Sequence, residues 1–294
     1  MTIQGAKKVL VTGSGGPLDS VIVPQLLAEG HGVRIFTDVP DKYKGVKGSS
    51  VEVVQGSYGN KKDLQKALDG ITGVCLMGAP HEEKHAKEVD DGKAVIDACL
   101  GKSIGHVVYV SVCCSGKNTG VPHFESKHEV EEYLKKSGLS YTILRPVWYM
   151  ENFTSKRYLP SIEKGVLSLP LRPDRTLELV SAVDVGRIIA EAFTVPDKLA
   201  EREIDIAADR LTMEEIAEEI SRVVPKKVVY EQMSASAARK DMGAGTVSMF
   251  EWLDAHGFDA DLLLVENLFK RFEISLTSFR GFLDRSRDEL RKAA

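Results

Sequence analysis

Glycines near the start of the chain are the first residues whose spacing suggests a chemical role. The segment VTGSGGPLDS places Gly13, Gly15 and Gly16 after an apolar run at residues 8–11 and before a helical pattern at residues 17–29. A glycine turn between a strand and a helix lets a pyrophosphate approach the backbone N–H groups of the helix N-terminus. The alternative is an ordinary tight turn. The residues expected to contact a dinucleotide here are Gly13, Ser14, Gly15, Gly16, Pro17 and Leu18.

An acidic residue follows the second apolar run of the chain. In RIFTDVPDK, Asp38 stands where a carboxylate can accept hydrogen bonds from the adenosine ribose hydroxyls and repel a 2′-phosphate, which favours NAD(H). Lys42 and Lys44 follow in the same loop and could reach a 2′-phosphate if Asp38 turned away. A solvated turn is the alternative to both roles. The loop therefore leaves NAD(H) and NADP(H) open.

These residues depend for their positions on an alternation of strands and helices. Continuously apolar runs such as KVLVTG and HVVYVSV are typical of a parallel sheet that helices cover on both faces. The expected strands are residues 8–11, 32–37, 50–55, 72–77, 105–112 and 141–145, separated by helices at 17–29, 60–68, 82–100 and 124–137. The sequence thus predicts an α/β fold with a Rossmann-type doubly wound parallel sheet. Its ligands are expected outside the carboxyl ends of the strands.

The pattern becomes less regular after about residue 150. Short strands are expected at 176–180, 203–207 and 227–230, mixed with helices. We predict a dinucleotide-binding Rossmann domain over residues 1–150, which also takes in about 176–194. A smaller α+β lobe over residues 151–294 is expected to shape the substrate pocket.

Charge and hydropathy limit the kinds of molecule that the protein is expected to bind. The 294 residues include 39 basic and 43 acidic ones, for a formal net charge of -4. This mixture gives no broad positive field for a phosphate backbone, so direct binding to nucleic acid is not expected. No run approaches the roughly 20 apolar residues that span a bilayer, and residues 1–8 show no apolar signal segment. We therefore expect a cytoplasmic protein with no membrane partner.

Four cysteines and one histidine string raise the question of metal binding. Cys75, Cys99, Cys113 and Cys114 show no CxxC spacing, and the default interpretation is that they are small buried hydrophobic residues. The adjacent pair Cys113 and Cys114 follows a strand that ends near the expected site, so a chemical role is the alternative. HEEKH at residues 81–85 matches a zinc-protease string but follows a Rossmann strand and lacks a third ligand. We predict no bound metal.

Several longer segments resemble the NmrA-like group of atypical short-chain dehydrogenases. They are VTGSGG, VVYVSV, HFESKHEVEEYLKKSGLSYTILRPVWYMENF, SAVDVGRII and LTMEEIAEEI. The resemblance implies NADP(H) as the usual cofactor. It also implies either reduction of small organic molecules or NADP-responsive regulation without turnover. The chain departs from the family at Asp38, often an arginine that reads the NADP phosphate, and at Asp19, where the loop's third glycine would stand.

The resemblance also indicates catalytic positions. Typical short-chain dehydrogenases use a Tyr-x-x-x-Lys pair and a serine after the preceding strand, and the matching residues here are His123, Lys127 and Ser111. A spacing of four places His123 and Lys127 on one helix face. The resemblance implies that Lys127 contacts the nicotinamide ribose and that His123 replaces the tyrosine as proton donor. Alternatively, His123 is a surface residue and Lys127 pairs with Glu131 one turn on.

Two further loops are expected to line the site, because they follow the fourth and sixth strands. The additional cofactor contacts expected there are Gly78, Ala79, Pro80, Pro146 and Tyr149. The substrate contacts expected there are His81, Trp148, Tyr149, Met150 and Phe153. For the aromatic and apolar side chains among them, the alternative is packing between the two lobes.

The sequence as a whole predicts an NAD(P)-dependent oxidoreductase that acts on a carbonyl, enone or imine of an apolar small molecule. One alternative is an NAD(P)-sensing regulatory protein without turnover, whose protein partner would respond to cofactor occupancy. A second alternative is a cofactor-assisted cyclisation enzyme of natural-product biosynthesis.

Overall fold

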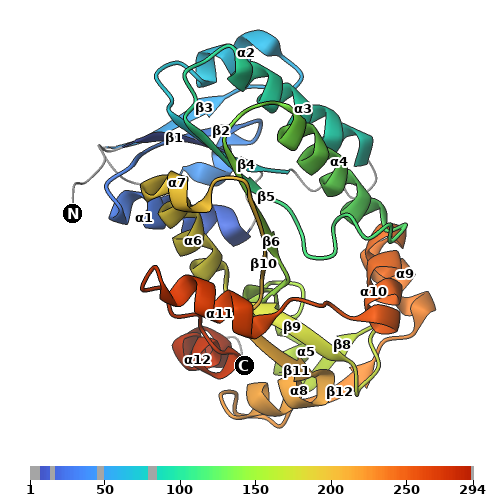
Figure 1. Cartoon of the computed structure of the whole chain (residues 1–294). Coiled ribbons are helices and arrows are strands. Elements are labelled where there is room, and N and C mark those ends of the chain that lie inside the picture. Colours follow the sequence, from blue (N-terminus) through green and yellow to red (C-terminus); the bar gives the residue numbers. More distant parts are fainter. Residues whose placement is uncertain (1–6, 14–16, 45–49, 79–84, 293–294) are drawn as a thin grey trace.

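A seven-stranded parallel sheet forms the centre of the molecule in the computed structural model, which describes residues 7–13, 17–44, 50–78 and 85–292 (Figure 1). The strands are β1 (Lys8–Thr12), β2 (Gly32–Thr37), β3 (Val51–Gln55), β4 (Gly73–Met77), β5 (His106–Val110), β6 (Tyr141–Pro146) and β10 (Arg202–Ile206). Their order is β10-β6-β5-β4-β1-β2-β3, and every neighbouring pair is parallel. The predicted Rossmann-type α/β fold is confirmed.

Helices cover both faces of this sheet (Figure 1). One layer contains α2 (Lys61–Ala67), α3 (His85–Leu100) and α4 (Pro122–Lys136); the other contains α1 (Pro17–Ala28), α6 (Ala182–Thr194) and α7 (Pro196–Leu199). In β1, Val9 and Val11 pack into one apolar core while Leu10 packs into another. This two-sided burial explains why the strand is continuously apolar.

Most of the remaining elements form a second part of the molecule (Figure 1). Its strands are β7 (Trp148–Tyr149), β9 (Thr176–Val180) and β11 (Asp209–Thr212) in one small sheet, and β8 (Val166–Leu169) and β12 (Val229–Gln232) in another. Its helices are η2 (Met150–Thr154), α5 (Leu159–Glu163), α8 (Met213–Ser221), α9 (Ala235–Met242), α10 (Ala244–His256), α12 (Phe279–Arg285) and α13 (Arg287–Lys292). Helix α11 (Leu262–Lys270) instead packs beside β10 on the core of the main sheet.

The strand that the sequence predicts at 203–207 belongs to the main sheet. It is β10, and it pairs in parallel with β6, with Ile204 opposite Leu144. The main sheet therefore takes in a segment from beyond residue 150, and the division of the chain into two lobes stays a prediction. Across the residues that the structure describes, no helix combines the length and apolarity needed to cross a membrane.

Candidate cofactor and active site

The strand order reverses between β1 and β4, which are neighbours although β1 is followed in the chain by β2 on its other side. At this point the fully buried Thr12 joins the carboxyl ends of the two strands. Its Oγ1 donates a hydrogen bond to the Met77 carbonyl at 3.0 Å and accepts one from the Met77 N–H at 2.8 Å. Ligands of open α/β sheets bind outside the strand ends at such a reversal.

The glycine loop begins directly beyond Thr12. Gly13 is buried, and its N–H donates to the Phe36 carbonyl of β2 at 3.2 Å. Pro17 is the first residue of α1, and the Leu18 side chain packs into the core, so Leu18 can offer a phosphate only its backbone. The predicted contacts that lie outside the described residues are Ser14, Gly15, Gly16, Ala79, Pro80 and His81.

The adenosine side of the expected site follows β2. Asp38 is exposed one residue past this strand, and Lys42 is exposed in the short helix η1 (Pro40–Tyr43). Lys44 forms an exposed ion pair with Asp41 at 2.8 Å. Both Asp38 and Lys42 thus keep accessible surface at the end of β2, as the two cofactor interpretations require.

Three elements meet around Lys127 at the carboxyl end of β4. The Lys127 Nζ lies 2.8 Å from Glu88 Oε1 of α3, and both side chains are almost fully buried. A Cβ atom on Gly78, directly after β4, would clash with the Glu88 carboxylate and lie 3.0 Å from Lys127 Nζ. The lysine therefore reaches the strand end where the sequence predicts the nicotinamide ribose. The alternative prediction, that Lys127 pairs with Glu131, is wrong, because Lys127 pairs with Glu88 whereas Glu131 pairs with Arg145.

Glu88 is a buried carboxylate that the sequence reasoning missed. Burial by itself would raise its pKa, but the charge and hydrogen bond of Lys127, with a further hydrogen bond from Ser126, hold the pKa of Glu88 below its usual value. The Ser126 hydroxyl donates to Glu88 Oε2 at 2.8 Å. Glu88 is therefore ionised at neutral pH. No local motif marks it, since its partners lie 38 and 39 residues away.

His123 is the second residue of α4 and lies one turn before Lys127. Burial lowers the pKa of His123 to about 4, and the positive charge of Lys127 adds to this effect. The imidazole is therefore neutral at neutral pH. It can donate a hydrogen bond to a substrate oxygen through its N–H, but it is not an imidazolium acid under these conditions.

Ser111 directly follows β5, and its N–H donates to the Leu144 carbonyl of β6 at 2.8 Å. Its buried hydroxyl has no hydrogen-bond partner within the described part of the chain. The buried Tyr109 hydroxyl also has no hydrogen-bond partner among the described residues. Burial, with Glu88 and Glu131 nearby, raises the pKa of Tyr109 well above its usual value, so this phenol stays protonated.

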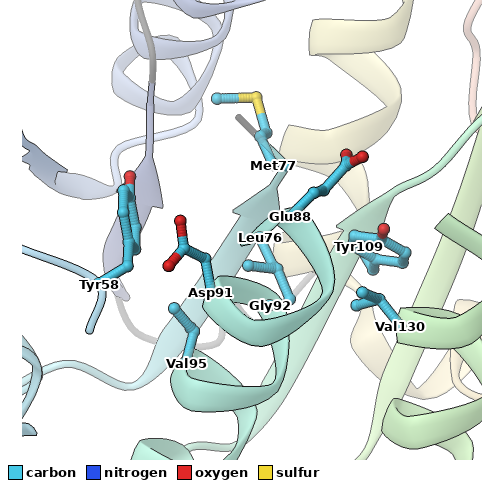
Figure 2. Close-up of a pocket in the computed structure, with 10 residues that line it drawn as sticks. Tyr58, Leu76, Met77, Glu88, Asp91, Gly92, Val95, Tyr109 and Val130 are labelled. Atoms are coloured by element: carbon cyan, nitrogen blue, oxygen red, sulfur yellow. The ribbon is translucent and has the colours of Figure 1, made fainter. Parts of the chain in front are cut away.

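A small pocket lies beside these residues, between α3 and the ends of β4 and β5 (Figure 2). Figure 2 shows Tyr58, Asp91, Met77, Glu88 and Tyr109 around it. The free space is about 10 Å³, close to the room that one water molecule needs. Glu88, the partner of Lys127, is one of the residues that line the pocket. The pocket is far too small for a substrate.

The apolar segment after β6 divides into exposed and buried members. Met150 and Phe153 are fully buried in the core of the second part, and the Phe153 ring lies 5.4 Å from that of Phe279. The structure favours the packing alternative for these two residues. Trp148 and Tyr149 are only partly buried, which leaves them surface with which to contact a ligand.

Pro146, the last residue of β6, is buried. Its carbonyl accepts a hydrogen bond from the Cys113 N–H at 3.1 Å. Pro146 therefore offers a cofactor little accessible surface.

Comparison with known proteins places this arrangement in context. A family model described as the NmrA-like family matches residues 5–283. The chain is 27% identical over 232 residues to a (4-alkanoyl-5-oxo-2,5-dihydrofuran-3-yl)methyl phosphate reductase of Streptomyces griseus, covering 79% of each chain. Triphenylmethane reductase of Citrobacter sp., solved with NADP(H), has a TM-score of 0.81 at 18% identity and covers 95% of this chain and 99% of its own. NmrA, a negative transcriptional regulator solved with NAD, has a TM-score of 0.78 at 20% identity, covering 99% and 98%.

Proposed function

The chain belongs to the NmrA-like family, as its sequence predicts, and on that premise we propose that it is an NAD(P)-dependent oxidoreductase. It would transfer hydride to or from a carbonyl, enone or imine of an apolar small molecule. The observation that carries the proposal is the position of Lys127, which reaches Gly78 at the carboxyl edge of the sheet next to the strand reversal.

The described residues fit a dinucleotide at several points. Gly13 and the start of α1 would receive the pyrophosphate, and Asp38 or Lys42 the adenosine ribose. Lys127 would donate hydrogen bonds to the ribose hydroxyls next to the nicotinamide, while Glu88 holds its ammonium group in place. The bound cofactor supplies the hydride, and the protein contributes mainly position.

The protein groups near the reacting atoms are a cation and a neutral imidazole. The Lys127 charge would favour negative charge that develops on a substrate oxygen. The neutral His123 would donate a hydrogen bond to the same oxygen. Trp148 and Tyr149 would offer partly exposed aromatic surface to an apolar substrate.

A second candidate function is cofactor sensing without turnover. It is supported by the fold shared with NmrA, which is a negative transcriptional regulator, and by a neutral histidine at the position of the usual catalytic tyrosine. A sensor must bind two cofactor forms with different affinity, because only a difference can shift its conformation.

Calorimetric titration of the purified protein with NADPH, NADH, NADP⁺ and NAD⁺ tests both candidates. Binding of a reduced form, followed by its oxidation with a quinone, an enone, an aldehyde or an imine, would support the oxidoreductase. Different affinities for the four forms without turnover on any of these compounds would support the sensor. Absence of binding would overturn both.

Asp38→Arg tests the adenosine side of the same proposal. Replacing the carboxylate by a guanidinium should shift the preference about tenfold or more towards NADPH, because Arg binds phosphate bidentately. Asp41→Arg, at an exposed residue of η1 in the same loop, is the matched control. An unchanged ratio of NADPH to NADH affinity in Asp38→Arg would remove Asp38 from the cofactor site.

A further inference from the structure

Two adjacent cysteines after β5 face one carboxylate from a distant part of the chain. Cys113 and Cys114 are 0% and 2% exposed, and their Sγ atoms lie 3.7 Å apart. Asp259, between α10 and α11, places its Oδ1 3.9 Å from Cys114 Sγ. All three ligand atoms lie within 4.8 Å of one another.

The backbone turns so that both thiols fall on the same side. Adjacent residues of an extended chain point in opposite directions. Cys114 instead has φ of 71°, in the left-handed region that costs a non-glycine residue about 1 kcal/mol or more. The turn is held at both sides, since the Cys113 N–H donates to Pro146 at 3.1 Å and the Ser115 N–H donates to Val112 at 3.2 Å.

The carboxylate is also held in place. The neighbouring Ala260 donates its N–H to Glu178 Oε2 at 3.1 Å and accepts at its carbonyl from Arg210 Nη2 at 3.1 Å. Asp259 Oδ2 forms an ion pair with Lys117. This leaves Oδ1 directed towards Cys114. The Asp259 side chain is 55% exposed, so a cation can reach the two buried thiols from solvent on this side.

These distances suit a tetrahedral thiolate complex. Two thiolates on one tetrahedral Zn²⁺, each at about 2.3 Å, lie about 3.8 Å apart, and the observed separation is 3.7 Å. A disulfide would require about 2.05 Å. Thiolate ligands select soft or borderline cations over Mg²⁺ or Ca²⁺. We propose that Cys113, Cys114 and Asp259 form a binding site for a thiophilic divalent cation such as Zn²⁺ or Cd²⁺, with water as the fourth ligand.

The charges of the surroundings agree with a divalent cation. Two thiolates and a carboxylate carry three negative charges, which one divalent cation and Lys117 balance. The carboxylates of Asp205 and Glu178 add negative potential at Cys113. A thiol must lose its proton to become a metal ligand. Binding therefore releases protons into solution.

Cadmium titration of the full chain, kept reduced with a phosphine instead of a thiol, tests the site. The wild type should bind one Cd²⁺ per chain with a thiolate-to-cadmium charge-transfer absorption and proton release. Cys113→Ser and Cys114→Ser should each weaken binding at least a hundredfold, and Asp259→Asn about tenfold. Cys99→Ser, at a single fully buried cysteine of α3, should bind as the wild type does.

Each remaining outcome counts against the site. No charge-transfer band in the wild type, or a band that persists in the Cys113→Ser/Cys114→Ser double variant, would overturn the proposal. An unchanged affinity in Asp259→Asn would overturn the three-ligand arrangement. Because Asp259 is exposed, this variant should keep the wild-type circular dichroism and remains informative even if a cysteine variant does not fold.

Discussion

Helix α4 carries two buried ionic residues one turn apart, Lys127 and Glu131, and their partners differ. Glu131 is fully buried and receives two hydrogen bonds from the guanidinium of Arg145 on β6, at 2.9 and 2.6 Å. Arg145 continues to Glu203 on β10. Lys127 donates a hydrogen bond to Glu88 on α3, with its Nζ 2.8 Å from Glu88 Oε1.

The difference indicates two tasks. The Glu131 network joins α4 to β6 through a bidentate contact, which fixes geometry as well as charge, and Arg145 extends it to the edge strand β10. A lysine ammonium has three donors, and among the described residues only Glu88 accepts a hydrogen bond from Lys127. The first pair therefore holds the edge of the sheet, whereas the second, on the proposed function, keeps donors for a ligand at the strand ends.

Breaking the Glu131–Arg145 pair should have the largest effect, which is a loss in the free energy of unfolding. Glu131→Ala leaves the mostly buried Arg145 without its bidentate partner, and loss of one member of a buried pair costs about 3–5 kcal/mol. Urea unfolding followed by circular dichroism measures the change in the free energy of unfolding. Glu129→Ala, which removes an exposed ion pair on the same helix, should cost under about 1 kcal/mol. Equal losses in the two variants would contradict the structural role of Glu131.

Breaking the Lys127 pair should reduce catalysis instead. Lys127→Met should lower cofactor-dependent kcat/KM about 100-fold, equivalent to about 2.7 kcal/mol, because the ribose and the substrate oxygen lose a cation. It also leaves Glu88 buried without its partner. The double variant Lys127→Met/Glu88→Gln removes that unpaired charge, so it should recover stability but not turnover.

Lys136→Met, at an exposed position of the same helix, is the matched control. Recovery of turnover together with stability in the double variant would show that Lys127 acts only through the fold. Wild-type turnover in Lys127→Met would remove it from the site altogether.

Adding a methyl group at the carboxyl end of β4 tests whether catalysis depends on the position of the Lys127–Glu88 pair. Gly78→Ala would place a methyl group against the Glu88 carboxylate and 3.0 Å from Lys127 Nζ, so both must shift. We expect kcat/KM to fall about tenfold, or about 1.4 kcal/mol, because catalysis is sensitive to small displacements. Gly101→Ala, where the added Cβ meets no atom within 4 Å among the described residues, should leave turnover unchanged. Full activity in Gly78→Ala would show that the position of the pair is not critical.

The two pairs also show what the sequence could and could not predict. Strands β1, β4 and β5 were predictable because they are apolar and buried on both faces. The i,i+4 rule suggested Glu131 for Lys127, but the actual partner lies 39 residues away on another helix. The sequence of β10 is like that of any short strand, and only its pairing with β6 shows that this strand extends the main sheet. Aromatic spacing likewise did not reveal that Phe153 is fully buried.

The pH dependence that Glu88 contributes to stability should be the smallest effect, since it comes from one group of the Lys127 pair. The folded state holds the pKa of Glu88 below its usual value of 4.5, although burial alone would raise it. The unfolded state therefore takes up the proton first as pH falls. The stability that Glu88 contributes is complete above about pH 4.5 and is lost as the pH falls through its folded pKa. Urea unfolding of the wild type and Glu88→Gln from pH 7 to pH 3 should show a steeper loss for the wild type, and parallel curves would mean that folding does not perturb this carboxyl.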